Sequence, residues 1–528
     1  MKIPARSKYE GDVFGAARDQ FDEILRWLHD EGTPLDHAIL EEDLSVRGTE
    51  LLRRLYQARL DLLSNREGGE DSEASEPRED AERKKGAPKK PKGKGKSAKK
   101  RSRGRPRSRA RGRQLESIFG RLRFKRQGIK VVGEKTRYPL DERLKLPEGL
   151  YTLPLQRRVA EEGRSGAWNH VVERIDASTG GHVPKRQAEA IAQAATRDFD
   201  AFYKESQPAN DTAGGDTLLL ASSDGKGIRM VPQALREATR KEAEADQAKA
   251  VRGDPMAQKK PRLHAKRMAV VTAVWEQEPL PRTAQDVVRE LRRAPRAERT
   301  KTPRQALPKR KNPRVWASVE KSLATGVGEM FDDLDRRDPS RQRPAIVLVD
   351  GEENQQTAIL DQGRIRSRRL TIVLDVIHVL HYLWCAGFVL CRKKAEATDL
   401  WVARNLLQLL SQPVPMLIAA IETEAVNRRL GINDRKQVDK ALKYFRRNAP
   451  FMDYPGFLAR GLPIATGVIE GACRHLVQDR LGITGARWDL AGADAVLKLR
   501  ALHASDDWHA YWQFHQRQEA LRRYDAAA

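Results

Sequence analysis

The chain has 528 residues, enough for two to four domains, and it carries a formal net charge of +26 with an isoelectric point near 10.0. A charge of this size predicts a polyanionic partner, and nucleic acid is the usual one. The three cysteines form no CxxC pair, which argues against a zinc finger or disulfide framework and fits a reducing cytoplasm. We find no long apolar run and no signal peptide, and therefore expect no membrane span.

The first two regions differ sharply in composition. Residues 1–66 have leucines at helical spacing and predict a helical region. Residues 67–113 are acidic and then polybasic, with 17 Lys or Arg between Arg83 and Arg113, and predict a disordered linker. Within it, an RGRPR segment is typical of an AT-hook, which enters the minor groove of A·T-rich DNA through Arg103, Arg105 and Arg107. The alternative is a generic polybasic tail that binds any phosphate backbone.

Residues 114–206 predict a β-hairpin followed by helices. The hairpin covers 115–132, with its turn at Gln127-Gly128. Residues 168–178 predict one helix, and a second begins at Pro184 and continues to 202 after a Gly-rich turn. This helix-turn-helix pattern favours DNA docking through Lys185 and Arg186, which open the second helix, although many helical hairpins share the pattern.

Residues 207–390 carry the strand signals of an α/β domain. An apolar run at Leu218–Leu220 leads to Asp224 and a Gly turn, and a second strand covers 268–275. A helix is predicted over 313–334. The apolar run 344–351 predicts a buried parallel strand that ends in Asp350, and a short strand at 371–374 precedes a helix over 375–390. Asp375 and His378 share a face of that helix.

The remaining chain is helical. Residues 391–461 predict an all-α insertion, and 462–528 predict a helix over 466–481 followed by a helix pair. Glu470 lies at the edge of the apolar stripe of the first helix, where a bare charge would be costly to bury. It is either a rim residue paired with Arg474 or a ligand in a site supplied by other elements.

Asp224 and Asp350 therefore both end apolar strands, and Glu470 is on a helix that could pack beside the same edge of the sheet. Ligands of open α/β sheets lie outside the carboxyl ends of the strands, and an all-oxygen ligand set suits Mg²⁺ or Mn²⁺. Two such ions would activate an attacking oxygen and stabilise the leaving oxygen of a phosphodiester. Each aspartate precedes a glycine and could instead be a turn residue. Glu352 and Glu353 are alternative carboxylates beside Asp350.

The chain resembles the DDE transposases of the ISKra insertion-sequence group. The resemblance covers roughly residues 115–515, and its longest segments are TIVLDVIHVLHYLW and GLPIATGVIEGACRHLVQDRLGITGARW, with KRMAVVTAVW and VLVDG as shorter ones. The basic run at 83–113 is not part of this pattern.

The resemblance implies a fold, an activity and a set of site residues. The fold is α/β, an RNase H-like mixed sheet with flanking helices and an all-α insertion, preceded by the helical and helix-turn-helix regions. The catalytic core is expected over 207–390 and 462–528. The triad of Asp224, Asp350 and Glu470 would hold two Mg²⁺ or Mn²⁺ ions, and Asp375 and His378 match a DxxH signature with a supporting role.

The implied function is cleavage of transposon ends and strand transfer into target DNA. We expect a homo-oligomer on DNA in the cytoplasm, associated with the nucleoid, with phosphate contacts from Arg474 and Arg487. A nuclease without strand transfer and a non-catalytic DNA-binding protein derived from a transposase are the alternatives.

Overall fold

The structure is a computed structural model that describes residues 12–30, 36–73, 107–130, 135–205, 217–251, 266–291, 306–392 and 394–525. It divides into two compact units. Unit 1 comprises residues 1–195 and 512–528, and unit 2 comprises residues 196–511. Within the described residues, no helix combines the length and apolar character needed to cross a membrane.

Unit 1 begins with a helical hairpin and a β-hairpin. Helix α1 spans Gly15–His29 and α2 spans His37–Glu73, as the leucine spacing of the first region predicts. Strands β1 (Arg107–Ser117) and β2 (Gly120–Lys130) pair antiparallel. The expected linker 67–113 is therefore too long at both ends, because α2 continues to Glu73 and β1 begins at Arg107. Arg103 and Arg105 lie outside the described residues, and only the backbone of Arg107 is described.

The predicted turn of the β-hairpin is wrong by nine residues. The chain turns at Ile118-Phe119, and Gly120 follows with φ +117°, a conformation that glycine adopts readily. Gly128 instead lies within β2, where a Cβ atom would come within 2.9 Å of the Tyr138 ring. A glycine that makes room for an aromatic ring has the same sequence signature as a turn glycine.

Three helices of unit 1 pack together behind the β-hairpin. Helices α4 (Leu153–Gly163), α5 (Trp168–Ser178) and α6 (Lys185–Ala194) share a buried core that includes Leu155, Ile175 and Ala188. Lys185 and Arg186 are exposed on the first turn of α6. The second predicted helix is too long, because α6 ends at Ala194 and α7 covers Phe199–Glu205.

Unit 2 contains a five-stranded mixed sheet in the order β5-β4-β3-β6-β7. Strands β3, β4 and β5 pair antiparallel, whereas β3, β6 and β7 pair parallel. The strands are β3 (Leu218–Arg229), β4 (Lys266–Gln277), β5 (Lys311–Ser318), β6 (Ala345–Val349) and β7 (Leu370–Leu374). All five residues of β6 are buried, as expected for a central parallel strand.

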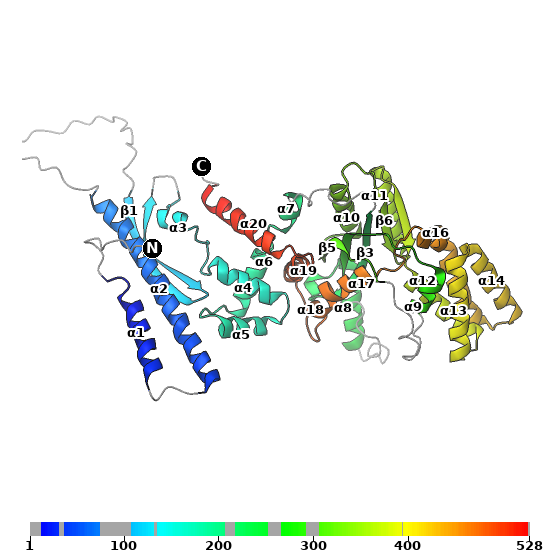
Figure 1. Cartoon of the computed structure of the whole chain (residues 1–528), viewed down its shortest axis with the longest axis horizontal. Coiled ribbons are helices and arrows are strands. Elements are labelled where there is room, and N and C mark those ends of the chain that lie inside the picture. Colours follow the sequence, from blue (N-terminus) through cyan, green and yellow to red (C-terminus); the bar gives the residue numbers. More distant parts are fainter. Residues whose placement is uncertain are drawn as a thin grey trace, which may run out of the picture. The chain divides into compact units, whose positions relative to one another are not determined.

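Helices cover both faces of this sheet. Helix α10 (Leu323–Arg337) packs on β3 and β4, with α11 (Glu353–Ile365) beside it (Figure 1). Helix α17 (Gly467–Ala472) packs on the opposite face of β3 and β4. The helix predicted over 313–334 is wrong in its first third, because residues 311–318 form β5. Ser322 then caps α10 by accepting a hydrogen bond from the Thr325 amide at 3.1 Å.

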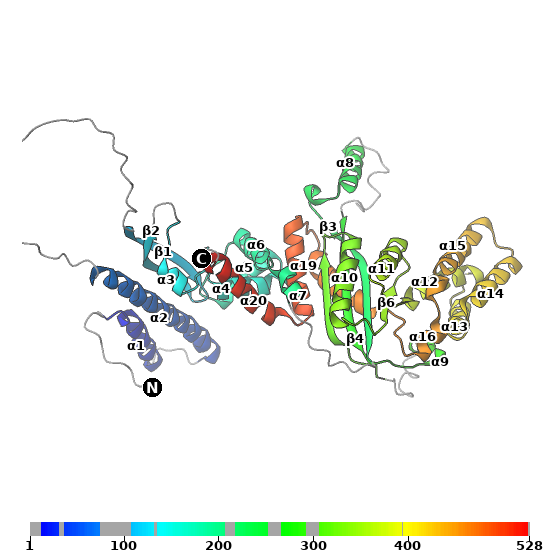
Figure 2. The same cartoon turned by 90° about the horizontal axis from the view of Figure 1, so that it is seen from above.

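The remaining helices of unit 2 extend from the sheet. Helix α8 (Glu237–Val251) projects from the end of β3 (Figure 2). Helix α12 (Val376–Leu390) and the helices of residues 395–459 lie on the side of β6 that faces away from β3 (Figure 2). Residues 395–459 contain α13 (Ala395–Ser411), α14 (Val414–Asn427), α15 (Ile432–Asn448), η3 (Ala449–Phe451) and α16 (Tyr454–Ala459). Helix α19 (Leu490–Ala504) packs on β5. The last helix, α20 (Trp508–Ala520), belongs to unit 1 from Trp512 onward.

Candidate functional site

The strand register places two of the predicted site residues at the same level of the sheet. Strands β3 and β6 pair in parallel, and their last pair is Ser222 opposite Leu348. Continuing this register by two residues sets Asp224, still within β3, opposite Asp350, the first residue after β6. Neighbouring strands are about 4.8 Å apart, and residues in the same register point to the same side. The predicted Gly turn after Asp224 is wrong, because β3 continues to Arg229. Asp350 follows β6 as expected.

A third aspartate continues this row. Strands β6 and β7 pair with Val349 opposite Leu374, and the next residues are Asp350 and Asp375. Continuing both registers past their last pairs therefore sets the three aspartates in one row at the carboxyl end of the parallel part of the sheet. A row of three carboxylates in one register concentrates negative charge there, which favours a bound cation.

Glu470 lies on the helical segment that covers this edge. The segment consists of α17 (Gly467–Ala472), a π-helical turn η4 (Cys473–Gln478) and α18 (Asp479–Leu481). Glu470 is exposed, and among the described residues its carboxylate has no ion-pair partner. Arg474 approaches Asp479 at 3.8 Å instead, so the rim pair between Glu470 and Arg474 is absent from the described structure. Single π-turns within α-helices often mark functional sites.

Cys473 connects this helical segment to the aspartate row. Its thiol donates a hydrogen bond to Asp224 Oδ2 at 3.2 Å. Burial and the charges of Asp224 and Glu470 raise the pKa of the Cys473 thiol. Both carboxylates therefore act on one sulfur atom. Cysteine is otherwise an ordinary residue for an apolar helix stripe, so the sequence alone gave no sign of this contact.

Three nearby carboxylates raise the pKa of His378. Its pKa is raised first by a hydrogen bond to Asp375, and the charges of Asp350 and Glu470 add to the effect. Glu470 thus acts on both Cys473 and His378, together with Asp224 at the first and with Asp350 and Asp375 at the second. The side-chain oxygens of Asp224, Asp350 and Glu470 do not all lie within 4.8 Å of one another in the described structure. Glu470 is exposed.

Asp375 is a buried junction between three elements. Its Oδ1 accepts the Ile377 amide at 2.8 Å and so caps α12, while its Oδ2 accepts the His378 ring at 3.2 Å and the Thr466 hydroxyl. Thr466 is the residue before α17. Asp375 is fully buried, so its carboxylate fixes the start of the Glu470 helix against β7 and orients His378. Its partners support a positioning role.

The loop after β6 is fixed by helix α15. Tyr444 donates a hydrogen bond to the Asp350 carbonyl at 2.7 Å, and Arg447 donates one to the Gly351 carbonyl at 2.5 Å. Gly351 has φ +94°, and a Cβ there would lie 2.7 Å from the Tyr444 hydroxyl oxygen. The Tyr444 ring stacks on Tyr382, with centroids 3.9 Å apart. The backbone that carries Asp350 is therefore held by the helical insertion, a contact that sequence spacing does not reveal.

The two alternative carboxylates after Asp350 have other partners. Glu352 accepts the Gln355 amide at 2.7 Å and caps α11. Glu353 is exposed and lies 3.7 Å from Arg447. The Glu352 backbone amide in turn donates to Asp350 Oδ1 at 2.9 Å, which orients that carboxylate.

The predicted DNA contacts are distributed over both units. In unit 2, Arg474 is exposed, and Arg487 is exposed beside Trp488, whose amide donates to the Arg229 carbonyl at 3.1 Å. The loop with Arg487 is thus attached to the end of β3. In unit 1, Lys185 and Arg186 are exposed on α6, as described above.

We expect the Tyr444→Phe variant to lose about 1 kcal/mol of folding free energy, because it removes one hydrogen bond to the Asp350 carbonyl and keeps the stacked ring. Urea unfolding of the purified protein measures this loss. Tyr382→Phe is the matched control, since it changes the other ring of the stack and should stay within about 0.5 kcal/mol of the parent. Equal stability of the two variants would contradict the assigned hydrogen bond.

The interaction of His378 with Asp375 should stabilise the fold most at low pH. The pKa of His378 is raised above its ordinary value of 6.5, so this stabilisation is fully present below pH 6.5. It is lost as the pH rises through the higher pKa of the folded state. The difference in free energy of unfolding between the parent and His378→Gln should therefore be larger at about pH 6 than at about pH 9. A difference that does not change with pH would argue against the charged pair.

Comparisons with protein-family models and with curated protein sequences gave no match.

Proposed function

We propose that the protein is a DDE transposase with an RNase H-like core that cleaves the ends of its insertion sequence and transfers them into target DNA. Two lines support the proposal. The motifs VLVDG, TIVLDVIHVLHYLW and GLPIATGVIEGACRHLVQDRLGITGARW resemble that family. The strand order β5-β4-β3-β6-β7, antiparallel in its first half and parallel in its second, is the arrangement expected of such a core.

One observation carries the proposal. Asp224 on β3 and Asp350 after β6 occupy the same level of the sheet, and the Glu470 helix contacts that level through the Cys473–Asp224 hydrogen bond. The three carboxylates belong to elements up to 246 residues apart in the sequence. The β3–β6 register, continued by two residues, sets the two aspartates opposite each other, which supports the proposal. Convergence of three acidic residues at the carboxyl edge of a sheet is typical of a catalytic site.

The donor set fits a hard divalent cation. Asp224, Asp350 and Glu470 offer only carboxylate oxygens, which Mg²⁺ and Mn²⁺ prefer, and these residues would hold the ions. Bound there, such ions would supply Lewis-acid activation of an attacking oxygen and stabilisation of the leaving oxygen. The chain itself holds the Asp350 backbone through Tyr444 and the start of α17 through Asp375. It thereby fixes two of the three ligand-bearing segments.

Electrostatics supports DNA as the substrate. The net charge of +26 provides a strong, salt-dependent attraction for phosphates. Exposed Arg474 lies on the same helical segment as Glu470, and exposed Arg487 lies on the loop that follows it. We propose that these two arginines contact the phosphates next to the cleaved bond, and that Lys185 and Arg186 dock the α5–α6 pair on the terminal repeat.

The test uses the full chain with DNA that carries both flanks of its gene, in Mg²⁺ and in EDTA. The proposal predicts cut ends and joined products in Mg²⁺ alone. Cut ends without joined products would identify a nuclease. DNA binding without cleavage would identify a non-catalytic DNA-binding protein.

A further inference from the structure

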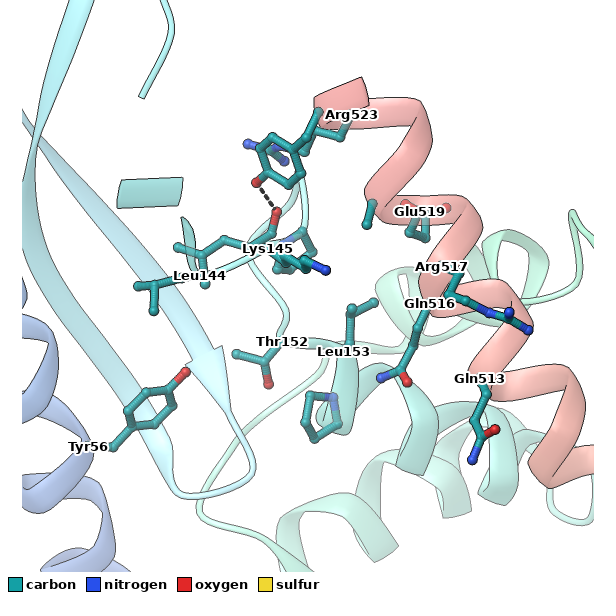
Figure 3. Close-up of a pocket in the computed structure, with 15 residues that line it drawn as sticks. Tyr56, Leu144, Lys145, Thr152, Leu153, Gln513, Gln516, Arg517, Glu519 and Arg523 are labelled. Carbon is teal, nitrogen blue, oxygen red and sulfur yellow. Dashed lines mark hydrogen bonds between the residues drawn. The ribbon is translucent and has the colours of Figure 1, made fainter. Parts of the chain in front are cut away.

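Unit 1 contains a pocket that the proposed function does not use. Its volume is about 690 Å³, within the range of small-molecule sites. Figure 3 shows it between the segment with Leu144 and Lys145 and helix α20, whose Gln513 and Gln516 side chains point toward it. All of its lining residues belong to unit 1, whereas the candidate catalytic site belongs to unit 2.

A buried arginine cluster lies against this pocket. Arg113 from β1, Arg126 from β2 and Arg523 from the C-terminal segment all pair with the carboxylate of Asp141. The Asp141 side chain is 2% exposed, and those of the three arginines are 7%, 15% and 25% exposed, respectively. Arg523 itself lines the pocket. Arg113 reaches the pocket wall by donating to the Pro147 carbonyl.

The cluster has more positive than negative charge. Among the described residues, Asp141 is the one acidic partner of the three arginines, so two positive charges lack a counter-charge. The nearby acids have their own cations, since Glu142 pairs with Arg137 at 3.0 Å and Glu519 with Arg522 at 2.5 Å. Uncompensated charges are costly to remove from water, which favours a bound anion.

The cluster also contains hydrogen-bond donors without a partner, which favours a bound anion as well. Arg126 Nε and Arg523 Nη1 are buried and have no hydrogen-bond partner in the described structure, and neither has the Asp141 Oδ1 acceptor. Of the two arginines, Arg523 lines the pocket. Burial and mutual repulsion within the cluster lower the pKa of Arg113 and Arg126. The face of the Tyr138 ring, 3.7 Å from the Arg126 guanidinium carbon, offsets only part of this excess. Guanidinium donors form strong, charge-assisted hydrogen bonds to phosphate oxygens.

We propose that this pocket binds a phosphate monoester. Such a group carries about −1.5 to −2 charges near pH 7, which matches the two uncompensated charges better than the single charge of a phosphodiester. Arg523 and Lys145 face the phosphate, and Thr152 and Gln516 add neutral hydrogen-bonding groups. Leu144, Leu153 and Tyr56 line the wall that would cover the organic part, such as a nucleoside. A free nucleotide and the terminal phosphate of a DNA strand share this chemistry.

Calorimetry on the full chain tests the proposal with inorganic phosphate, AMP and adenosine as probes. AMP should bind, and Arg523→Gln should weaken it by roughly tenfold or more, because one charged hydrogen-bond donor is lost. Lys145→Gln should weaken it as well. Arg174→Gln is the matched control in unit 1, since Arg174 is 61% exposed and pairs with Glu162 outside the pocket. All variants keep the polybasic residues 83–113, so any difference between them reports on the pocket.

Two outcomes would overturn the proposal. One is that the parent binds neither AMP nor phosphate more tightly than adenosine. The other is that Arg523→Gln binds AMP as tightly as Arg174→Gln does. A thermal melt of each variant checks that unit 1 remains folded. If Arg523→Gln unfolds, the AMP affinity of Lys145→Gln tests the proposal instead, because Lys145 is exposed and its replacement should leave the fold intact.

A second arm separates the two sources of the phosphate. The full chain is titrated with the same DNA duplex bearing either a 5′-phosphate or a 5′-hydroxyl. Tighter binding of the phosphorylated duplex that disappears in Arg523→Gln assigns the pocket to a DNA end. AMP binding without any effect of the 5′-phosphate assigns it to a free nucleotide. These measurements need no cleavage activity, so the pocket can be established even if the protein proves not to be a transposase.

Discussion

Replacing Glu470 with glutamine should reduce Mg²⁺-dependent cleavage of element-end DNA by at least about 10²- to 10³-fold. The substitution keeps the size of the side chain and removes the one charge that α17 contributes to the site. Glu470 is exposed and has no ion-pair partner in the described structure, so the fold should not depend on it. Single-turnover cleavage rates, with DNA binding and a thermal melt on the same samples, measure the effect.

Glu353→Gln is the matched control for this experiment. Glu353 is a second exposed glutamate near Asp350, with its side chain 75% exposed and 3.7 Å from Arg447. We expect this variant to cleave within about twofold of the parent, because an exposed pair of this kind contributes little. Loss of cleavage in Glu353→Gln together with normal cleavage in Glu470→Gln would show that the third metal ligand is Glu353, which follows β6, and not Glu470.

Replacing Asp375 with asparagine should lower the free energy of unfolding by about 3 kcal/mol. The buried carboxylate accepts hydrogen bonds from the Ile377 amide, the His378 ring and the Thr466 hydroxyl. In asparagine an NH₂ group replaces one carboxylate oxygen, and this group cannot accept the hydrogen bonds that the oxygen accepts. Because Thr466 precedes α17, the variant should also displace Glu470 and reduce cleavage. Urea unfolding measures the stability.

Asp489→Asn is the control for Asp375→Asn. Asp489 also caps a helix, accepting the Gly492 amide at 2.7 Å, but it is exposed and asparagine caps equally well. This variant should change stability by less than about 0.5 kcal/mol. If both variants are equally mild, Asp375 is an ordinary helix cap and does not hold the site together.

The strands with continuous apolar runs could be predicted from the sequence. β4 and β6 contain the apolar residues of VVTAVW and AIVLV, and burial on both faces leaves a pattern that periodicity detects. The sequence of β5 predicts a helix, because Val315, Val319 and Leu323 recur every four residues. Its pairing with β4, Val315 opposite Ala273, is a contact between distant segments and overrides that local pattern.

Part of the site could be predicted, and part could not. Carboxylates next to apolar runs are visible in the sequence, so the sequence predicts Asp224 and Asp350 as site residues although the predicted turn at Gly225 is wrong. The contacts of Cys473 with Asp224 and of Tyr444 with the Asp350 carbonyl join segments 249 and 94 residues apart. Neither residue type signals such a contact. The buried arginines Arg113 and Arg126 were likewise indistinguishable in sequence from their exposed neighbours in a basic chain.

The central claim is that Asp224, Asp350 and Glu470 form one metal site, and rescue of a cysteine variant by manganese tests it most directly. Asp350→Cys places a softer ligand at the predicted position, and Mn²⁺ accepts sulfur more readily than Mg²⁺ does. The account predicts that this variant does not cleave element-end DNA in Mg²⁺ and regains cleavage in Mn²⁺, while Glu470→Gln stays inactive in both. Full cleavage by Asp350→Cys in Mg²⁺ would show that Asp350 does not hold the metal.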